Sequence, residues 1–415
     1  MQWLRTAMAI FAMAFGGVVT ADPPTVNYVF PAGGQRGTTV AARIGGCNLH
    51  DAPRLIWTGH GVTAPTTLQP ANTLWLEGPL IPQPASQQKE DYPRDFAAML
   101  VIDRDAPPSG QAWRLATSQG VTSPWRFVIG DLPEVVEAEI DGETPATPID
   151  LPVTINGRIF PREDVDEWRF IATAGQRISI HVATAEFGSP LAARITVLDD
   201  AGRVLGESLP EGKSTPSIRF AVPADGGYRV RIHDASLGGL QDHVYRLTVT
   251  TGPVLDAVFP LGGRRGTTTQ FELSGAHLPS AAMMVTLPSQ GTEQVITLAD
   301  HSHGFGAVSV QLDELDEVLE SAASSSPTTF TVPAVLNGRI TRSGEHDRWV
   351  FAAIKGAEYE FDLRAARLGS PLDAVLSVQD ATGQEFMEVD DTTGLETDPR
   401  LRWTAPADGE FSVVV

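Results

Sequence analysis

The chain has 415 residues, with 39 glycines, 31 prolines, 42% hydrophobic residues and 20% charged residues. This length suffices for about two to four domains, and the composition is typical of a folded protein with many turns rather than a helical bundle or a disordered tail. The formal net charge of −21 argues against nucleic acid and anionic lipid as partners and favours cations such as calcium.

The N-terminus predicts an export signal. Arg5 precedes an apolar run over about residues 7–19, and small residues lead to a cleavage position after Ala21. The run is shorter than the roughly 20 residues that span a bilayer, so we expect a cleaved signal rather than an uncleaved membrane anchor, and no membrane span after cleavage. We therefore expect a secreted, periplasmic or cell-surface protein.

Two sequence modules alternate along the chain. The segment “INGRIFPREDVDEWRFIATAGQ” from Ile155 matches “LNGRITRSGEHDRWVFAAIKGA” from Leu336, at an offset of 336 − 155 = 181, and “GSPL” occurs in both copies. A second pair, “PTVNYVFPAGGQRGTTVAARIGGCNL” from Pro24 and “PVLDAVFPLGGRRGTTTQFELSGAHL” from Pro253, has an offset of 253 − 24 = 229. The order is A-B-A-B, and we name the modules A1, B1, A2 and B2.

The predicted boundaries are residues 1–21 for the signal peptide, 22–132 for A1, 133–251 for B1, 252–330 for A2 and 331–415 for B2. The connector over residues 130–159 is rich in prolines and acidic residues, so we expect it to be extended. By alignment, Val415 matches Ile232, where B1 still continues into a last strand. We expect either that the chain is a fragment, which we favour, or that B2 has an unpaired edge.

Both modules predict strands. The segment “WRFIATAGQRISIHVATA” alternates apolar and polar residues with a turn in its middle, and similar short strands follow at regular spacing. The expected fold class is therefore all-β, with tandem β-sandwiches of which A is immunoglobulin-like and B jelly-roll-like. Residues 312–326 (“LDELDEVLESAASSS”) are the one helix-like run, expected as a short helix or a loop.

Module B, with “NGRI”, an acidic turn, “D-x-W-x-F”, “AGQ”, “GSPL” and “ADGxYxVxI”, resembles the bacterial pre-peptidase C-terminal domain, in the version common in secreted proteins of planctomycete-type bacteria. Module A, with “VFPxGGxRGTT” and “SPWRFVIGDLPEVVEAE”, resembles the IPT-type immunoglobulin-like domains that precede it there. The resemblance implies β-sandwiches that serve as non-catalytic appendages of secreted peptidases and other exported proteins, some of which bind calcium or aid attachment to substrate. A fold alone does not assign a task.

Two glycine-rich stretches invite a phosphate-binding interpretation. The “GKST” within residues 206–216 has the wrong glycine spacing for a phosphate loop, and Pro216 opposes the helix that must follow. The “GGQRG” of A1 and its copy in A2 predict a turn with positive φ. We expect Arg36 and Arg265 to hold this turn through salt bridges, with a partner contact as the alternative.

The sequence gives little indication of a histidine metal site or of a catalytic cysteine. His301 and His303 beside Asp300 could ligate zinc, but a solvated loop is the preferred interpretation because A1 has no counterpart. Cys47 is the only cysteine, so the fold does not depend on an internal disulfide, and it lacks the pattern of a thiol nucleophile. Its counterpart Ala276 indicates a small packing position.

The loop “VDDTTGLETDPRL” of B2 is the best candidate binding site. Asp390, Asp391 and Asp398 surround a turn at Gly394, and a hard cation such as Ca²⁺ prefers several oxygen ligands from a flexible loop. The matching B1 loop lacks the paired aspartates, so the site would belong to B2 only. The alternative is an acidic surface hairpin, in which aspartates form the turn.

The recurring aspartates and tryptophans have structural interpretations. Asp166 and Asp347, each two residues before a tryptophan, are expected to bond turn backbone at the start of a strand. Trp168 and Trp349 share a strand face with a phenylalanine two residues later, which predicts core packing. An exposed aromatic platform for carbohydrate is the alternative.

The sequence thus predicts a non-catalytic, secreted multi-module protein for binding, spacing or attachment. Its partner would be an extracellular polymer, polysaccharide or protein, or a downstream catalytic domain. The alternative is the N-terminal accessory region of a larger extracellular peptidase or other hydrolase whose catalytic domain lies beyond residue 415.

Overall fold

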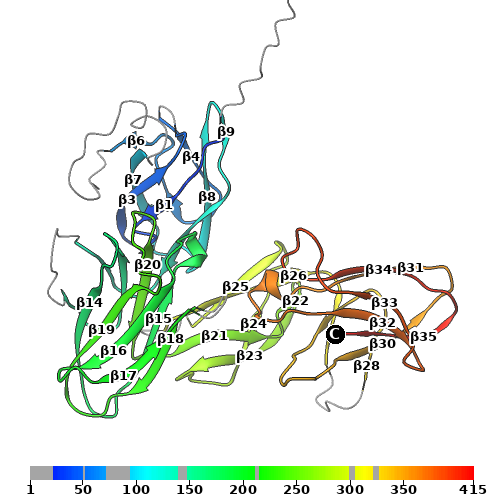
Figure 1. Ribbon diagram of the computed structural model, residues 1–415. Coiled ribbons are helices and arrows are strands. Elements are labelled where there is room, and N and C mark those ends of the chain that lie inside the picture. Colours follow the sequence, from blue (N-terminus) through cyan, green and yellow to red (C-terminus); the bar gives the residue numbers. More distant parts are fainter. Residues whose placement is uncertain are drawn as a thin grey trace, which may run out of the picture.

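The computed structural model describes residues 22–49, 52–71, 94–138, 147–210, 215–298, 304–320 and 327–415. These residues form strands β1 to β35 and two short 3-10 helices, which confirms the all-β fold class. The modules follow one another along a bent, elongated molecule (Figure 1). In the part of the chain that is described, no helix has the length and apolar character needed to cross a membrane. The expected signal peptide lies outside the described residues.

Each A module places two sheets around a small core, with Phe127 buried in A1 and Phe271 in A2. In A1 the sheets have the orders β1-β3-β7-β5, with β6 beside β7, and β2-β10-β8-β4, with β9 beside β8. The strands are β1 (Tyr28–Phe30), β2 (Gly33–Gln35), β3 (Thr39–Gly46), β4 (Arg54–Trp57), β5 (Val62–Thr63), β6 (Gln69–Pro70), β7 (Arg94–Ile102), β8 (Gly110–Thr117), β9 (Gly120–Val121) and β10 (Trp125–Gly130). In A2 the orders are β21-β23-β24 and β22-β26-β25, from β21 (Val254–Phe259), β22 (Gly262–Arg264), β23 (Thr268–Ala276), β24 (Ala282–Thr286), β25 (Glu293–Thr297) and β26 (Ala307–Asp313).

The repeated glycine-rich stretch of the A modules is a turn after β2 and β22. Gly37 has φ 78° and Gly266 has φ 71°, a left-handed conformation that glycine adopts without steric cost. Arg36 forms a salt bridge with Asp131, and Arg265 donates to the Gly291 carbonyl at 2.9 Å. Arg265 also forms a salt bridge with Glu314, at 3.9 Å. The expectation of a positive-φ turn whose arginine forms a salt bridge is therefore confirmed in both A modules.

Module B1 is a sandwich of two five-stranded sheets, β11-β13-β20-β15-β18 and β12-β14-β19-β16-β17. Its strands are β11 (Glu134–Val136), β12 (Thr147–Pro148), β13 (Val153–Arg158), β14 (Asp166–Ala172), β15 (Arg177–Ala183), β16 (Ala193–Asp199), β17 (Val204–Ser208), β18 (Ser217–Ala221), β19 (Gly226–Asp234) and β20 (Val244–Thr250). Inward residues of both sheets, such as Ile155 and Phe170, form one continuous core. The connector is not a free spacer, because β11 and β12 pair with β13 and β14.

Module B2 repeats most of this plan. Its strands are β27 (Asp316–Leu319), β28 (Thr328–Thr329), β29 (Ala334–Asn337), β30 (Arg348–Ala353), β31 (Glu358–Asp362), β32 (Leu376–Asp380), β33 (Glu385–Val389), β34 (Arg400–Thr404) and β35 (Gly409–Val414). One sheet has the order β28-β30-β35-β32-β33, as in B1. The other half of the sandwich consists of the separate pairs β27-β29 and β31-β34.

The helix or loop expected over residues 312–326 is wrong for its described part. This stretch holds the end of β26 and the whole of β27, which pairs in parallel with β29; residues 321–326 lie outside the described residues. The segment “LDEVLES” from Leu315 matches “LPEVVEA” from Leu132, at an offset of 183. β27 therefore pairs with a strand of B2 as β11 pairs with one of B1, although β27 precedes the predicted boundary at 330.

The “GSPL” repeat ends a 3-10 helix in each B module. In B1 it follows η1 (Ala185–Phe187) and in B2 it follows η2 (Ala366–Leu368). Gly188 and Gly369 have φ values of 78° and 81°, so glycine is favoured at both positions. A Cβ on Gly188 would lie 2.8 Å from the Trp125 ring, which shows that this turn packs directly on A1.

An arginine of “NGRI” contacts an aromatic ring of the preceding A module in both halves. The Arg158 guanidinium lies 4.4 Å from the Phe30 ring centroid and 5.1 Å from that of Tyr28. The Arg339 guanidinium lies 3.9 Å from the centroid of Phe259, the counterpart of Phe30. A cation over an aromatic face contributes about 0.5–2 kcal/mol, with the larger value for desolvated pairs.

A glutamate of the connector holds the asparagine of “NGRI” in both halves. Asn156 donates to Glu134 at 2.7 Å, and Asn337 donates to Glu317 at 2.5 Å. Glu134 also forms a buried salt bridge with Arg246 of β20, at 2.7 Å. The A–B junction is therefore a repeated structural unit built from one connector strand and one “NGR” strand.

Among the described residues, B2 has no strand at the position that β20 takes in B1. In B1, β20 lies between β13 and β15 and pairs with both. The counterparts of its neighbours, β29 and β31, are not paired with each other. Side chains beside this gap lose burial: Ile155 is fully buried, whereas its counterpart Leu336 is half-buried.

An added strand at this gap is expected to stabilise B2. Extending the chain after Val415 with a copy of residues 233–250 should raise the B2 unfolding midpoint by about 5 °C, because its apolar residues would be buried between β29 and β31. Differential scanning calorimetry measures the shift. The control extension replaces the residues copied from Tyr245, Leu247 and Val249 with serine, and an equal midpoint for both extended chains would contradict the expectation.

Candidate functional site

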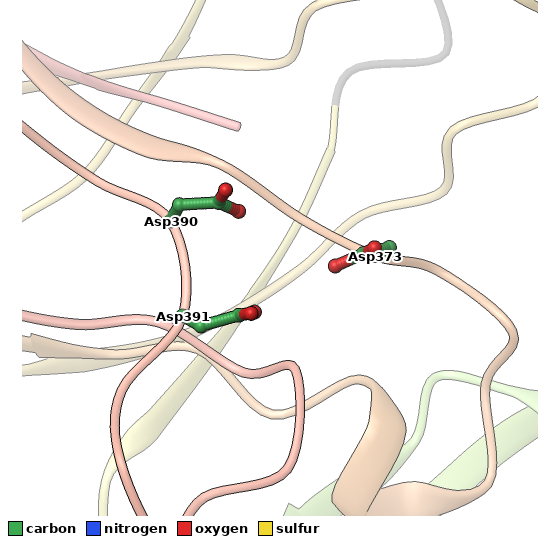
Figure 2. Close-up of side chains that lie close together, drawn as sticks. All are labelled: Asp373, Asp390 and Asp391. Atoms are coloured by element: carbon green, nitrogen blue, oxygen red, sulfur yellow. The ribbon is translucent and has the colours of Figure 1, made fainter.

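Three exposed aspartates of B2 bring their carboxylates together. Asp373 follows “GSPL” before β32, and Asp390 and Asp391 follow β33. One carboxylate oxygen of each residue lies within 4.8 Å of the others. Figure 2 shows the three side chains pointing toward a common space from two chain segments.

The structure brings together two of the three residues that the sequence grouped as a metal site. Asp390 and Asp391 lie together as the loop suggested, but their neighbour is Asp373, which sequence reasoning did not single out. The B1 counterparts of the three residues are Ala192, Leu209 and Pro210 at the 181 offset. An aspartate that replaces Ala192 after “GSPL” was the available signal, and the difference restricts the cluster to the second copy.

The structure does not place Asp398 in the cluster. Its side chain is fully buried and accepts hydrogen bonds from the backbone N–H groups of Ala365, Ala366 and Arg367, at 2.8–3.1 Å. The Arg367 guanidinium donates to it at 2.7 Å. Burial opposes ionisation of Asp398, but these hydrogen bonds outweigh burial and hold its pKa below the ordinary value. Its oxygens anchor η2 and are not available to an ion.

The cluster fits a hard cation in charge and spacing. Two oxygens that each lie about 2.4 Å from a Ca²⁺ ion can be at most about 4.8 Å apart, and calcium accepts six to eight oxygen ligands. Three exposed carboxylates would supply part of this shell, and water would supply the rest. A bound ion would join the segment before β32 to the loop after β33.

In the described part of the chain, the turn backbone is bonded by other acids than Asp166 and Asp347, which corrects the sequence expectation. The Tyr245 hydroxyl donates to Asp166 at 2.6 Å in the B1 interior. The turn backbone is held instead by Asp164 in B1 and Glu345 in B2, two residues earlier. The alternating pattern correctly placed the aspartates at a strand start but could not show which acid faces inward.

The tryptophans of the B modules pack in the core as expected. Trp168 is 2% exposed and Trp349 is 3% exposed. In A1, Trp113 is buried, and Trp125 lies against B1 near Gly188. These rings stabilise the sandwiches and the A1–B1 contact, so they form no exposed platform for a sugar.

The remaining candidates either lie outside the described residues or occupy a packing position. Asp300, His301 and His303 lie outside the described residues, as does most of “GKST”. Cys47 is half-buried just after β3, and its counterpart Ala276 ends β23, consistent with a packing position.

The comparisons with known proteins give distant structural likenesses. No protein family and no curated protein matches the sequence. Among solved structures, the pre-peptidase C-terminal domain of a Bacillus anthracis collagenase is similar at 18% identity, covering 27% of this chain and 100% of that chain, with a TM-score of 0.23. PliG, a periplasmic inhibitor of g-type lysozyme from Aeromonas hydrophila, is similar at 16% identity over 28% of this chain and 97% of its own, with a TM-score of 0.21.

A longer likeness covers most of the chain. SGBP-B of a Bacteroides ovatus mixed-linkage glucan utilization locus, solved with a heptasaccharide, is similar at 11% identity over 95% of this chain and 74% of its own, with a TM-score of 0.19. At such identities and TM-scores these likenesses assign no function. The sheets themselves define the class of protein: a chain of tandem β-sandwich modules.

Replacing Asp398 should destabilise B2 far more than replacing a cluster aspartate. Asp398→Ala removes a charged acceptor from three backbone donors and Arg367, which should cost about 3 kcal/mol of unfolding free energy. Asp390→Ala, at an exposed position, should change it by less than about 0.5 kcal/mol in calcium-free buffer. Urea unfolding of both variants measures the difference, and similar losses would contradict the assigned role of Asp398.

Proposed function

We propose that this chain is a non-catalytic accessory or attachment protein that acts outside the cytoplasm. Each A–B pair is one rigid unit, and two units in series set the spacing between a binding partner and whatever the chain is attached to. The partner is an extracellular polymer, polysaccharide or protein.

The main support for this proposal is that the residues repeated in both halves have structural roles. The residues that recur in both halves, among them Asn156, Arg158 and Trp168, contact the connector, the A module or the sandwich core. What the duplication preserves is therefore the stability of the sandwich and the angle between A and B. A repeated catalytic function would instead preserve a nucleophile and its base on an accessible surface.

A second candidate function is the N-terminal accessory region of a larger extracellular peptidase or other hydrolase. The gap between β29 and β31 supports it, because a continuing chain is one source for a strand there. In that case the catalytic domain would lie beyond residue 415. The coding sequence after codon 415 distinguishes the two candidates.

Binding to polymers tests the first proposal directly. The purified chain should co-sediment with at least one insoluble extracellular polymer, such as peptidoglycan, cellulose, chitin or collagen, and should release no soluble product from it. Polymer cleavage by the purified chain would refute a non-catalytic role, and failure to bind any of the panel would refute attachment to this class of polymer.

We further propose that Asp373, Asp390 and Asp391 bind Ca²⁺. Extracellular calcium modules have dissociation constants of about 10⁻⁴–10⁻³ M. At 10 mM calcium, a site in this range stabilises the folded state by about 1.4–2.7 kcal/mol. The stabilised module is B2, because B1 lacks all three carboxylates.

Calcium should therefore raise the unfolding midpoint of B2 by several degrees. In Asp390→Asn/Asp391→Asn the rise should disappear, because the ion loses two charged ligands, whereas Glu385→Gln on the neighbouring strand β33 should keep it. Scanning calorimetry with 10 mM calcium and with EDTA provides the measurement. An unchanged rise in the double variant would rule out this site.

A further inference from the structure

Two carboxyl groups meet at each A–B junction. Glu137, directly after β11, accepts from the Arg158 N–H, and Asp166, at the start of β14, accepts from the hydroxyl of Tyr245, whose ring lies against Gly157. In the second half, a Cβ on Gly338 would lie 3.0 Å from a carboxylate oxygen of Glu320 and 2.8 Å from one of Asp347. Each pair of carboxyl groups therefore flanks the glycine of “NGR”, and two neighbouring carboxyl groups favour a state in which one of them keeps a proton.

Each pair lies where the connector attaches to the “NGR” strand. The backbone N–H of Arg158 donates to the Glu137 carboxylate at 2.8 Å, and that of Arg339 donates to Glu320 at 2.7 Å. Glu137 and Glu320 also donate their own N–H groups to the asparagine carbonyls of the “NGR” strands, both at 2.9 Å. The side chains of these two arginines cover the A-module rings, so each carboxyl pair lies between the connector and the A–B contact.

Burial of the first pair favours a bound proton, and the charge of Asp164, in the turn before β14, acts in the same direction. Arg158 of β13 and the hydroxyl of Tyr245 on β20 act in the opposite direction, because they stabilise the ionised carboxylates. Burial raises the pKa of Glu137 to about 7, and burial together with the charge of Glu137 raises the pKa of Asp166. On the connector itself, Glu134 is already neutralised by Arg246.

The second pair has a similar setting with fewer neighbours. Burial, followed by the charge of Glu320 and then that of Glu345, raises the pKa of Asp347 to about 6. Arg339 faces the pair through its backbone, while its guanidinium lies on Phe259 and pairs with Glu272 at 2.8 Å.

We propose that the A–B junction is a pH-dependent attachment: a shared proton between Glu137 and Asp166, and between Glu320 and Asp347, holds the connector on the B module. When both members of a pair are ionised, their repulsion weakens the attachment. The angle between A and B is then less strictly held. The protein is thereby more rigid in mildly acidic surroundings than in alkaline ones.

The direction of the pH effect follows from proton binding. An unfolded glutamate has a pKa of 4.5, whereas folded Glu137 keeps its proton to about pH 7. Between these values the folded state binds more protons than the unfolded state, so stability is greatest below the unfolded pKa and is lost as pH rises through the folded one. The window for Asp347 runs from its ordinary pKa of 3.8 to about 6.

Unfolding midpoints of the full chain at pH 5 and pH 8 test the proposal. Glu137→Gln/Glu320→Gln leaves one titratable carboxyl group in each pair, so the repulsion between two ionised carboxylates is removed. The midpoint of the original chain should fall from pH 5 to pH 8, and that of this variant should fall by at least about 4 °C less. Asp166→Asn/Asp347→Asn should give the same smaller fall and serves if the first variant does not fold. Glu207→Gln, at an exposed pair with Arg194, should keep the original fall.

Amide hydrogen exchange tests whether the pH dependence of stability arises at the A–B junctions. After correction for the intrinsic pH dependence of exchange, protection of the Arg158 and Arg339 N–H groups should decrease about tenfold from pH 5 to pH 8 in the original chain and not in the glutamine variant. An undiminished fall of the midpoint in both double variants, or protection that is the same at both pH values in the original chain, would overturn the proposal.

Discussion

The contact between the “NGR” arginine and the aromatic ring of the preceding module is the interaction on which this architecture depends. A β-sandwich buries its own core and needs no neighbour, so tandem sandwiches have no fixed mutual angle unless a specific contact provides one. Arg158 and Arg339 contribute to it by covering Phe30 and Phe259, and in the first half Phe187 and Gly188 of B1 also pack on A1. The connector glutamates and asparagines hold the strands from which these arginines project.

The arginine of the A–B junction is more deeply buried in the first half than in the second. In the first half, the arginine is 99% buried and the connector glutamate has Arg246 as a charged partner within 2.7 Å. The second half keeps the same hydrogen bonds in a more exposed setting. Glu317 has no such partner among the described residues, and burial raises its pKa to about 7. Burial without a neighbouring cation favours the protonated form of a carboxyl group.

Some residues recur in both halves of the chain, whereas others occur in one half only, and the two groups have different roles. Residues common to both halves build the sandwiches and junctions. The Asp373, Asp390 and Asp391 cluster belongs to B2 alone and lies on its surface, so the core does not require it. An exposed group of like charges lowers stability unless a counterion offsets the repulsion, and this makes the cluster the clearest candidate for a ligand in the described part of the chain.

The sequence by itself revealed the two repeated segments, the strand alternation and the positive-φ glycine turns. Repeats are found by comparing the chain with itself, and alternation and turns are local patterns that need no knowledge of tertiary contacts. The sequence suggested a short helix or a loop over residues 312–326, because apolar residues at 312, 315 and 319 mimic a helical face. The parallel pairing of Asp316 with Ala334, 334 − 316 = 18 residues later, leaves no such local pattern. Only the tertiary structure decided that Asp398 anchors η2, that Asp373 joins Asp390, and that Asp166 meets Glu137. The strand pairing between segments distant in sequence decides which carboxylate oxygens lie close together. In the sequence, an acidic residue near a turn looks the same whether its carboxylate faces water, a backbone donor or another acid.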